Sequence, residues 1–264
     1  MNAGDRRRFR RGFNDTRERD DRMTSVQNHY DRLLGPLYGW MLGDGEKARE
    51  RARQELHDAG ISAGDGLAVD LGAGNGLHAV PLAESGYAVV AIDTCQSLLD
   101  ELRESSGTFA ITAVRDSLET FRRHCPTAPD VVVCMGDTLT HLPSREAVQG
   151  LISEVAASLA PGGIFVTTFR DYVRGVLEGP ARFIPVQSDE EKILTCFLEY
   201  GRDRVIVHDI LHTRALSGWE MTVSAYPKVR LDPEWVGAQL GQRGLQVCTE
   251  PGQRGMVRIV ARKI

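Results

Sequence analysis

The sequence has few cysteines and no long apolar run, and each of these absences excludes a class of protein. Its five cysteines are scattered, with no Cys-x-x-Cys pair, so they fit reduced thiols better than a disulfide framework or a zinc site. No apolar run approaches the ~20 residues that span a bilayer, and no secretory hydrophobic region follows the N-terminus. We therefore expect a cytoplasmic protein without a membrane partner.

The sequence also lacks a strong charge of one sign. Its 32 Lys and Arg residues against 36 Asp and Glu residues give a formal net charge of −4, so nothing indicates electrostatic attraction to nucleic acid. The apolar content of 42% and the charged content of 26% are ordinary for a globular protein. A chain of 264 residues is long enough for one large α/β domain, or for a domain with an insertion.

The first 60 residues divide into two segments. Residues 1–24 are dense in Arg and Asp and poor in apolar side chains, so we predict a disordered arm. Residues 25–60 carry aromatics and leucines at roughly helical spacing with Gly-Pro interruptions. They predict a helical cap of short helices followed by a longer helix from about Gly45 to Ala59.

Strands and helices then alternate, and this alternation sets the fold class. Near-continuous Val, Ile and Ala strands between amphipathic helices predict a parallel sheet that is covered on both faces. The expected strands are 67–71, 88–93, 108–114, 130–136 and 162–169, and the expected helices are 76–85, 96–105, 116–124 and 144–160.

The rhythm changes after Phe169. Three segments, 191–201, 203–216 and 218–231, read as antiparallel strands joined by tight turns. A helix at 232–244 and a final strand pair, 245–251 and 255–263, complete the chain. We therefore predict an α/β fold: a Rossmann-like, doubly wound, mainly parallel seven-stranded sheet over residues 61–264, with an antiparallel β-meander at 191–230, inserted after strand five.

A glycine loop follows the first predicted strand, with the spacing Gly72-x-Gly74-x-Gly76. A dinucleotide fingerprint needs its third glycine where this sequence has Leu77, and no Gly-Lys-Ser/Thr ending of a P-loop is present. Asp70, just before the loop, would repel a pyrophosphate but can orient an amino group. Asp93, at the end of the second strand, is placed to bind ribose hydroxyls. An amino acid that carries a nucleoside fits this arrangement better than a phosphate does.

Four motifs in order carry a family resemblance: "VDLGAGNG", Asp93 ending "VVAID", "RDSLETF" and "LAPGGIFV". Together they resemble class I S-adenosylmethionine-dependent methyltransferases, strongly from about Asp65 to Phe169. The late β-meander is similar in position to the insertion of glycine N-methyltransferase-like and natural-product methyltransferases. The resemblance implies S-adenosyl-L-methionine as cofactor and S-adenosyl-L-homocysteine as product. It assigns cofactor contacts to Tyr30, Asp70, Gly72, Ala73, Gly74, Asp93, Thr94, Asp116, Ser117 and Met135. For Asp116, helix capping is an equally good interpretation. For Tyr30, simple packing is an equally good interpretation.

Catalytic and substrate-binding candidates follow strands four and five, since ligands of such sheets lie at the carboxyl ends of the strands. His141 titrates near neutrality and is a candidate general base, although a loop histidine is the commoner outcome. Asp137 is a candidate anchor for a substrate amine or hydroxyl, and a turn residue is the alternative. Arg170 and Arg182 can clamp a carboxylate. The meander adds five further candidates: Glu199, Tyr200, His208, His212 and Tyr226. Because side chains alternate along a strand, about half of them should face solvent or the core. We select Tyr200 as a substrate-binding residue.

A metal site is not expected. Asp137 and Asp171 resemble the ligands of metal-assisted catechol-type methyltransferases, but Tyr172 stands where a further ligand is needed. We predict a methyltransferase acting on an N, O or C nucleophile of a small molecule, and a homodimer is compatible with the sequence. The alternatives are methylation of tRNA or protein, or a regulator that binds the cofactor without turnover.

Overall fold

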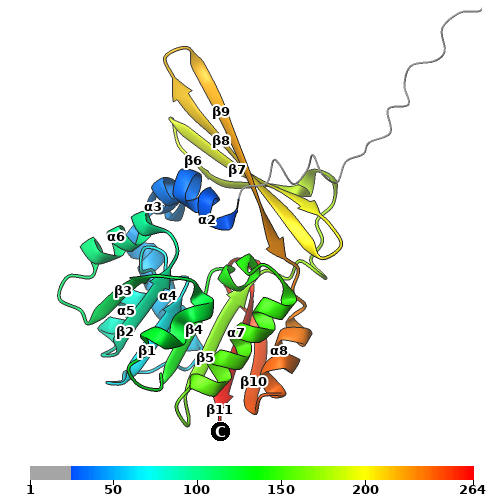
Figure 1. Ribbon diagram of the computed structural model, residues 1–264. Coiled ribbons are helices and arrows are strands. Elements are labelled where there is room, and N and C mark those ends of the chain that lie inside the picture. The colour runs from blue at the N-terminus through cyan, green and yellow to red at the C-terminus, as the bar shows by residue number, and fades with distance from the viewer. Residues whose placement is uncertain (1–24) are drawn as a thin grey trace, which may run out of the picture.

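Seven strands form a central sheet, sheet A, in the computed structural model, which describes residues 25–264 (Figure 1). The predicted arm, 1–24, lies outside the described residues. The strands of sheet A lie in the spatial order β10 (Leu245–Pro251), β11 (Val257–Lys263), β5 (Ile164–Phe169), β4 (Val131–Cys134), β1 (Leu67–Leu71), β2 (Ala88–Asp93) and β3 (Ile111–Arg115). β3, β2, β1, β4 and β5 are parallel, and β11 pairs antiparallel with β5. The predicted sheet is confirmed.

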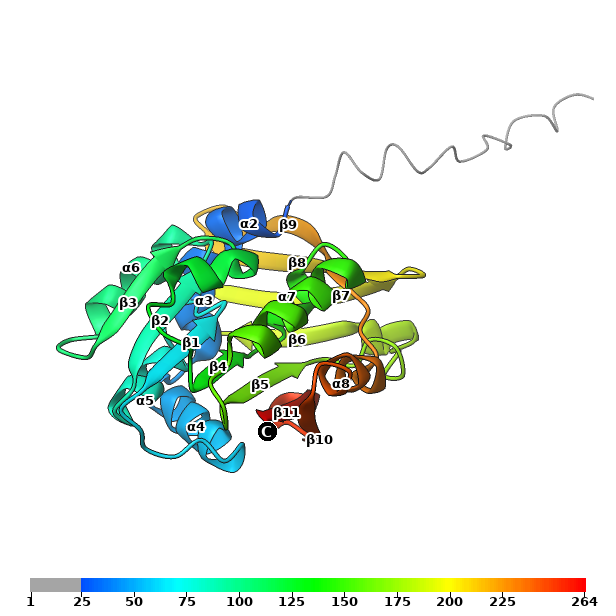
Figure 2. The ribbon, with the colours of Figure 1, turned by 60° about the horizontal axis from the view of Figure 1, so that its bottom comes forward.

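Helices cover both faces of sheet A, because the strand side chains alternate between two apolar cores. Leu67, Val69 and Leu71 of β1 pack in the core on the side of α7 (Arg145–Ser158) and α8 (Pro233–Gly241). Ala68 belongs to the opposite core, which contains residues of α4 (Gly45–Asp58), α5 (Ala79–Glu84) and α6 (Gln96–Ser105). Figure 2 shows the resulting three layers.

The N-terminal cap consists of short helices that precede α4. They are α2 (Val26–His29), a π-helix (Tyr30–Leu34), a 3-10 helix (Gly35–Leu37) and α3 (Tyr38–Leu42). α4 begins where Asp44 accepts hydrogen bonds from the backbone N–H groups of Glu46 and Lys47, a regular N-cap. The helix predicted from Gly45 is confirmed.

The insertion forms a second sheet, sheet B, which lies over the carboxyl ends of the parallel strands (Figure 1). Its antiparallel strands lie in the order β6 (Phe183–Ser188), β7 (Lys192–Tyr200), β8 (Arg204–Ala215) and β9 (Gly218–Val229). The predicted meander is present, but the start predicted at residue 191 is too late. β6 carries Pro185 and a register irregularity, features that are tolerated at a sheet edge and obscure the strand pattern.

Two further boundaries differ from the sequence prediction. The segment after β3 is a 3-10 helix, Leu118–His124, rather than an α-helix. α5 begins at Ala79 rather than residue 76, because Gly72, Gly74 and Gly76 all have positive φ and continue the loop. Among the helices of residues 25–264, none combines the length and the apolar character that a membrane span requires.

Candidate active site

The glycine loop is tightly packed where it leaves β1. Gly72 has φ +78°, and a Cβ atom at this position would clash with the side chain of Thr138. The backbone N–H of Gly74 donates to Oδ2 of Asp93 at 2.8 Å. The other carboxylate oxygen of Asp93, Oδ1, accepts from the N–H of Cys95, also at 2.8 Å. Asp93 therefore fixes the glycine loop to the end of β2, and burial raises the pKa of its carboxyl group.

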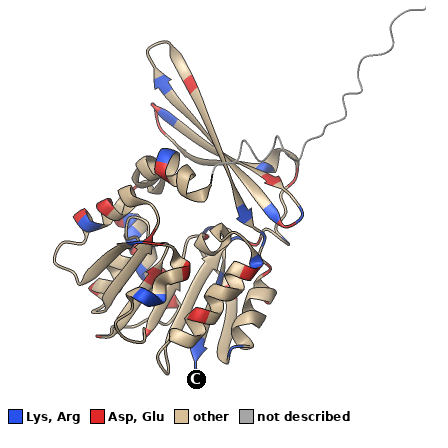
Figure 3. Cartoon of the chain, viewed as in Figure 1, with Lys and Arg blue, Asp and Glu red and all other residues tan. Residues whose placement is uncertain are grey.

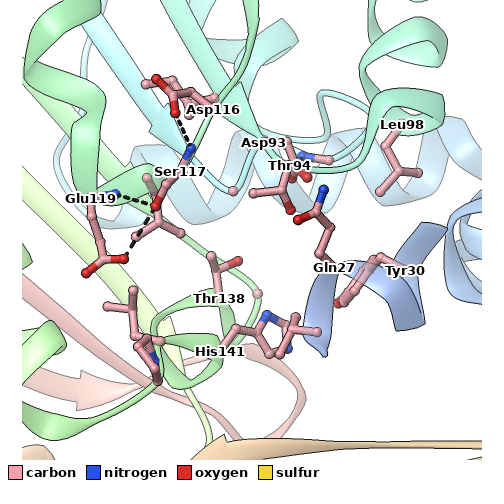
Figure 4. Close-up of a pocket in the computed structure, with 18 of the residues that line it drawn as sticks. Gln27, Tyr30, Asp93, Thr94, Leu98, Asp116, Ser117, Glu119, Thr138 and His141 are labelled. Carbon is pink, nitrogen blue, oxygen red and sulfur yellow. Dashed lines mark hydrogen bonds between the residues drawn. The ribbon is translucent and has the colours of Figure 1, made fainter. Parts of the chain in front are cut away.

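A cavity, which we call the glycine-loop cavity, opens beside this loop between the end of β2 and the N-terminal cap (Figure 4). Gln27 and Tyr30 reach into it from the cap, and Asp93 and Thr94 from the end of β2. Eight predicted site residues line it: Tyr30, Gly72, Gly74, Asp93, Thr94, Asp116, Ser117 and His141. Sequence reasoning missed Tyr38, Gln27, Glu119 and Thr138, which also line it.

Asp70, Ala73 and Met135 are buried next to the glycine-loop cavity rather than lining it. Burial, together with the nearby carboxylate of Asp93, raises the pKa of Asp70 to about 6. Within residues 25–264, Oδ2 of Asp70 has no hydrogen-bond partner. A buried carboxylate oxygen without a partner is costly. The contact of Asp70 with the amino group of an amino-acid ligand stays a prediction.

Asp116 lines the glycine-loop cavity, but it does not cap the following helix, so the capping interpretation is wrong for this residue and its contact with the cofactor stays a prediction. Its Oδ1 accepts from the backbone N–H of Ser117 at 2.7 Å, and its Oδ2 lies 2.7 Å from Nε2 of His124. The contact with His124 is the main cause that lowers the pKa of Asp116 to about 2. Ser117 caps the following 3-10 helix by accepting from the N–H of Glu119. Both residues therefore organise the turn while they line the cavity.

His141 ends a short 3-10 helix, Thr138–His141, that follows β4. The rings of Tyr30 and Tyr226 flank its imidazole, with ring centroids at 5.6 and 5.7 Å. Burial, and then the positive charge of Lys228, lower the pKa of His141 well below its ordinary value. In the described part of the chain, the buried Nε2 atom has no hydrogen-bond partner. His141 is therefore a neutral imidazole with a free ring nitrogen.

Asp137 is held by the protein itself, and its predicted role as a substrate anchor stays a prediction. Its Oδ2 accepts from Nζ of Lys228 at 2.6 Å and from the hydroxyl of Tyr172 at 2.8 Å, and its Oδ1 accepts from the N–H of Arg170. Both oxygens are engaged, and the residue is buried. Asp137 ties the end of β4 to β9 of the insertion. In the sequence, the only signal for Lys228 as the partner of Asp137 is the alternation of β9, which places Tyr226 and Lys228 on one face.

A second and larger cavity, the inter-sheet cavity, lies between sheet A, sheet B and the N-terminal cap. Its volume is about 550 Å³, against about 230 Å³ for the glycine-loop cavity. Arg170 lines it, as expected for a substrate-binding residue. The two cavities share Tyr30, Tyr38 and Gly136 as lining residues, so they meet beside the glycine loop.

Arg182 and Tyr200, the other two predicted substrate ligands, line neither cavity. The guanidinium of Arg182 lies 4.9 Å from the ring centroid of Phe197. The hydroxyl of Tyr200 accepts from the backbone N–H of Leu177, and its ring packs beneath Arg230. Local packing directs Arg182 against Phe197 and Tyr200 against Leu177 and Arg230, so neither residue gains support as a substrate ligand.

Sequence reasoning also missed a buried contact that joins the N-terminal cap to sheet B. Nε2 of His29 lies 2.9 Å from Oδ2 of Asp209, and Nδ1 lies 2.7 Å from Oγ of Ser224. The ring of His29 stacks on Tyr226 with the centroids 4.1 Å apart. This contact closes the cap over the cavities and supports the tyrosine that flanks His141. No local motif reveals it, because its members are 180 and 195 residues apart.

Asp171 does not complete a metal site with Asp137. Its Oδ1 accepts from the backbone N–H groups of Val173 and Arg174 in a tight turn. Within residues 25–264, no three His, Cys, Asp or Glu side chains converge as metal ligands.

The fold and the site together define the class of this protein. The strand order, the glycine loop and the acid that ends β2 are those of a class I S-adenosylmethionine-dependent methyltransferase, for which S-adenosylmethionine is the cofactor. Residues 68–163 match the family described as "Methyltransferase domain".

Curated relatives and solved structures agree with this class. The chain is 27% identical over 106 residues to the glycine/sarcosine N-methyltransferase of Aphanothece halophytica, covering 39% of this chain and 40% of the relative. It is 32% identical over 116 residues to the ubiquinone biosynthesis O-methyltransferase of Idiomarina loihiensis, covering 42% and 45%. The chain thus spans less than half the length of these relatives. The amino pentose methyltransferase of Micromonospora echinaspora, solved with bound S-adenosylmethionine, shares the fold with a TM-score of 0.70, 15% identity, and coverage of 88% and 97%.

Proposed function

We propose that this protein transfers the methyl group of S-adenosylmethionine to an N, O or C nucleophile of a small molecule bound in the inter-sheet cavity. The main support is that the glycine-loop cavity and the inter-sheet cavity meet, since both are lined by Tyr30, Tyr38 and Gly136. A nucleoside held by Asp93 in the glycine-loop cavity leaves its amino-acid end toward the glycine loop. An acceptor in the inter-sheet cavity then reaches the reacting centre from the side of sheet B.

The protein's own residues supply position and a proton acceptor. When bound, the cofactor supplies an electrophilic methyl group on a sulfonium, which is transferred by in-line displacement. Asp93 orients the ribose, and Asp70 offers its free oxygen to the amino group. The insertion and the cap cover the site and exclude water, which strengthens electrostatic contacts within it. The neutral imidazole of His141 accepts the proton that the nucleophile loses.

A small molecule is favoured over tRNA or protein as the acceptor. Sheet B and the cap cover the cavity, which restricts access of a macromolecule. The net charge is −4, and in the view of Figure 3 the Lys and Arg positions along the ribbon are interspersed with Asp and Glu positions rather than gathered in one basic stripe. The absence of a nucleic-acid partner, a cytoplasmic location and a homodimer remain predictions. A second copy would cover Trp219, Met221 and Val223, exposed apolar residues on one face of β9.

The first test is a calorimetric titration of the purified protein with S-adenosylhomocysteine, with NADH as control. Low-micromolar or tighter binding of the first and no binding of NADH would support the proposal and justify a methyl-acceptor screen. Binding without turnover of any acceptor would favour the alternative of a regulator. No binding of S-adenosylhomocysteine would contradict the assignment of the glycine-loop cavity.

His141→Ala is expected to lower kcat by roughly 10²-fold or more, the usual contribution of a general base. Affinity for S-adenosylhomocysteine should stay unchanged, because the cofactor contacts come from other side chains. The measurement is steady-state kinetics with calorimetry, and His57→Ala, which changes an exposed histidine of α4, is the matched control. Wild-type turnover in His141→Ala would leave His141 a packing residue.

The pH dependence of kcat provides an independent test of the same group. A base acts in its neutral form, which predominates above its pKa. Because the pKa of His141 is lowered well below 6.5, we expect kcat at saturating cofactor to stay constant from pH 8 down to 6.5. Saturation is needed because Asp70, with a pKa of about 6, loses charge in the same range as the pH falls. A midpoint above pH 6.5 that disappears in His141→Ala would contradict the shift.

A further inference from the structure

The inter-sheet cavity carries a surplus of positive charge. Three carboxylates line it: Asp137 pairs with Lys228, whereas Glu55 and Asp209 contact the imidazoles of His78 and His29. Within residues 25–264, Oε1 of Glu55 has no hydrogen-bond partner. Three arginines, Arg51, Arg170 and Arg254, line the same cavity. Within residues 25–264, none of their guanidinium groups forms an ion pair, and only that of Arg170 makes a hydrogen bond, to the backbone oxygen of Arg254 at 3.2 Å.

Within residues 25–264, some other arginines are paired with acids: Arg53 contacts the carboxylates of Glu46, Glu50 and Glu84, and Arg258 contacts that of Glu250. Arg51 and Arg254 are exposed and Arg170 is half-buried. What sets these three apart is that they line one cavity. Three like charges at one cavity repel each other, so their arrangement favours a ligand that brings negative charge.

The three arginines come from distant parts of the chain that are fastened together. Arg51 lies on α4, Arg170 directly follows β5, and Arg254 lies in the turn between β10 and β11. In that turn, the side-chain amide of Gln253 donates to the backbone oxygen of Arg51 at 3.2 Å. Arg254 itself has φ +53°, a left-handed conformation that is uncommon for arginine. The hydrogen bonds from Gln253 and Arg170 hold the turn against the rim of the cavity.

The cofactor cannot neutralise these charges. S-adenosylmethionine has one carboxylate against one ammonium and one sulfonium, so its binding adds net positive charge. Solvent ions or the other ligand of the same site can supply the negative charge. Guanidinium groups bind carboxylate and phosphate through paired N–H donors. An anionic group of the second ligand would therefore be a carboxylate or a phosphate.

We propose that the methyl acceptor carries an anionic group, a carboxylate or a phosphate, that Arg51 and Arg254 bind together with Arg170. The proposal rests on the proposed function and narrows its substrate class to anionic small molecules. The acceptor's nucleophile then lies toward Tyr30 and His141, and its anionic end lies toward the turn between β10 and β11.

The test titrates the protein with acetate and with inorganic phosphate, each with and without saturating S-adenosylhomocysteine, by calorimetry. We expect one of the two anions to bind saturably, and its identity tells carboxylate from phosphate. Arg51→Gln and Arg254→Gln should each weaken this binding about tenfold or more, the scale of a lost charge-assisted hydrogen bond. Arg254→Lys, which retains the charge, should lose less. Arg214→Gln, at an exposed position at the end of β8, should have no effect.

Three results would overturn the proposal. One is that neither anion binds, and another is that the Gln variants bind the anion as the wild type does. The third is that Arg254→Gln weakens S-adenosylhomocysteine as much as it weakens the anion, because the arginines would then hold the cofactor's own carboxylate. The proposed function fails separately, through absence of S-adenosylhomocysteine binding to the wild type.

Discussion

Asp93→Ala is expected to lower the affinity for S-adenosylhomocysteine by roughly 10- to 100-fold. Hydrogen bonds to a charged group contribute about 1.5–3 kcal/mol, and about 1.4 kcal/mol corresponds to tenfold in affinity. The carboxylate lines the glycine-loop cavity and accepts from the N–H groups of Gly74 and Cys95. Its loss therefore removes a ribose ligand and also frees the glycine loop. The measurement is calorimetric titration, with Asp100→Ala, an exposed acid of α6, as control.

A pair of ligands separates these two effects of Asp93. The wild type should bind adenosine more tightly than 2′,3′-dideoxyadenosine, because only adenosine carries the two ribose hydroxyls. In Asp93→Ala this preference should vanish, since nothing is left to recognise the hydroxyls. If the preference persists while both ligands bind more weakly, Asp93 acts only by holding the glycine loop, and the ribose assignment is wrong.

The parts of the fold that could be predicted are those in which local sequence and tertiary structure agree. β1, β2 and α6 occur at the predicted residues, because a continuous apolar strand and an amphipathic helix each have a distinct period. The strand β6 was missed because Pro185 interrupts it, and only pairing with β7 makes it a strand. Its stability comes from a neighbour, so its own sequence carries little signal.

The same distinction applies to the site. Residues that lie on the glycine loop or at strand ends, such as Gly72, Asp93 and His141, could be identified because the order of elements fixes their place. Contacts between the cap, sheet A and sheet B could not, because they join residues far apart in the chain. Asp137 was visible as an acid at a strand end, but its partner Lys228 follows 91 residues later. Its structural contact with Lys228 could not be predicted for that reason.

The largest effect on stability is expected from this Asp137–Lys228 ion pair. Both residues are buried, so replacement of one leaves the other with an uncompensated charge, which costs about 3–5 kcal/mol. For a domain of this size that corresponds to roughly 6–20 °C in Tm. Asp137→Asn and Lys228→Met should each show such a loss in urea and thermal unfolding. Asn tolerates the left-handed φ of +75° at position 137, so backbone strain does not confuse the result.

The double variant Asp137→Asn, Lys228→Met decides whether the loss comes from the pair. With both charges removed, no buried charge is left unpaired, so the double variant should be clearly more stable than the sum of the single losses predicts. Arg103→Met, which breaks the exposed pair with Asp100, should cost at most about 1 kcal/mol and serves as control. Strictly additive losses would mean that each residue stabilises the protein through other contacts. Sub-additive losses would identify the ion pair as the link that fastens the insertion to the end of β4. The same pair would then hold sheet B, which covers the inter-sheet cavity, to sheet A.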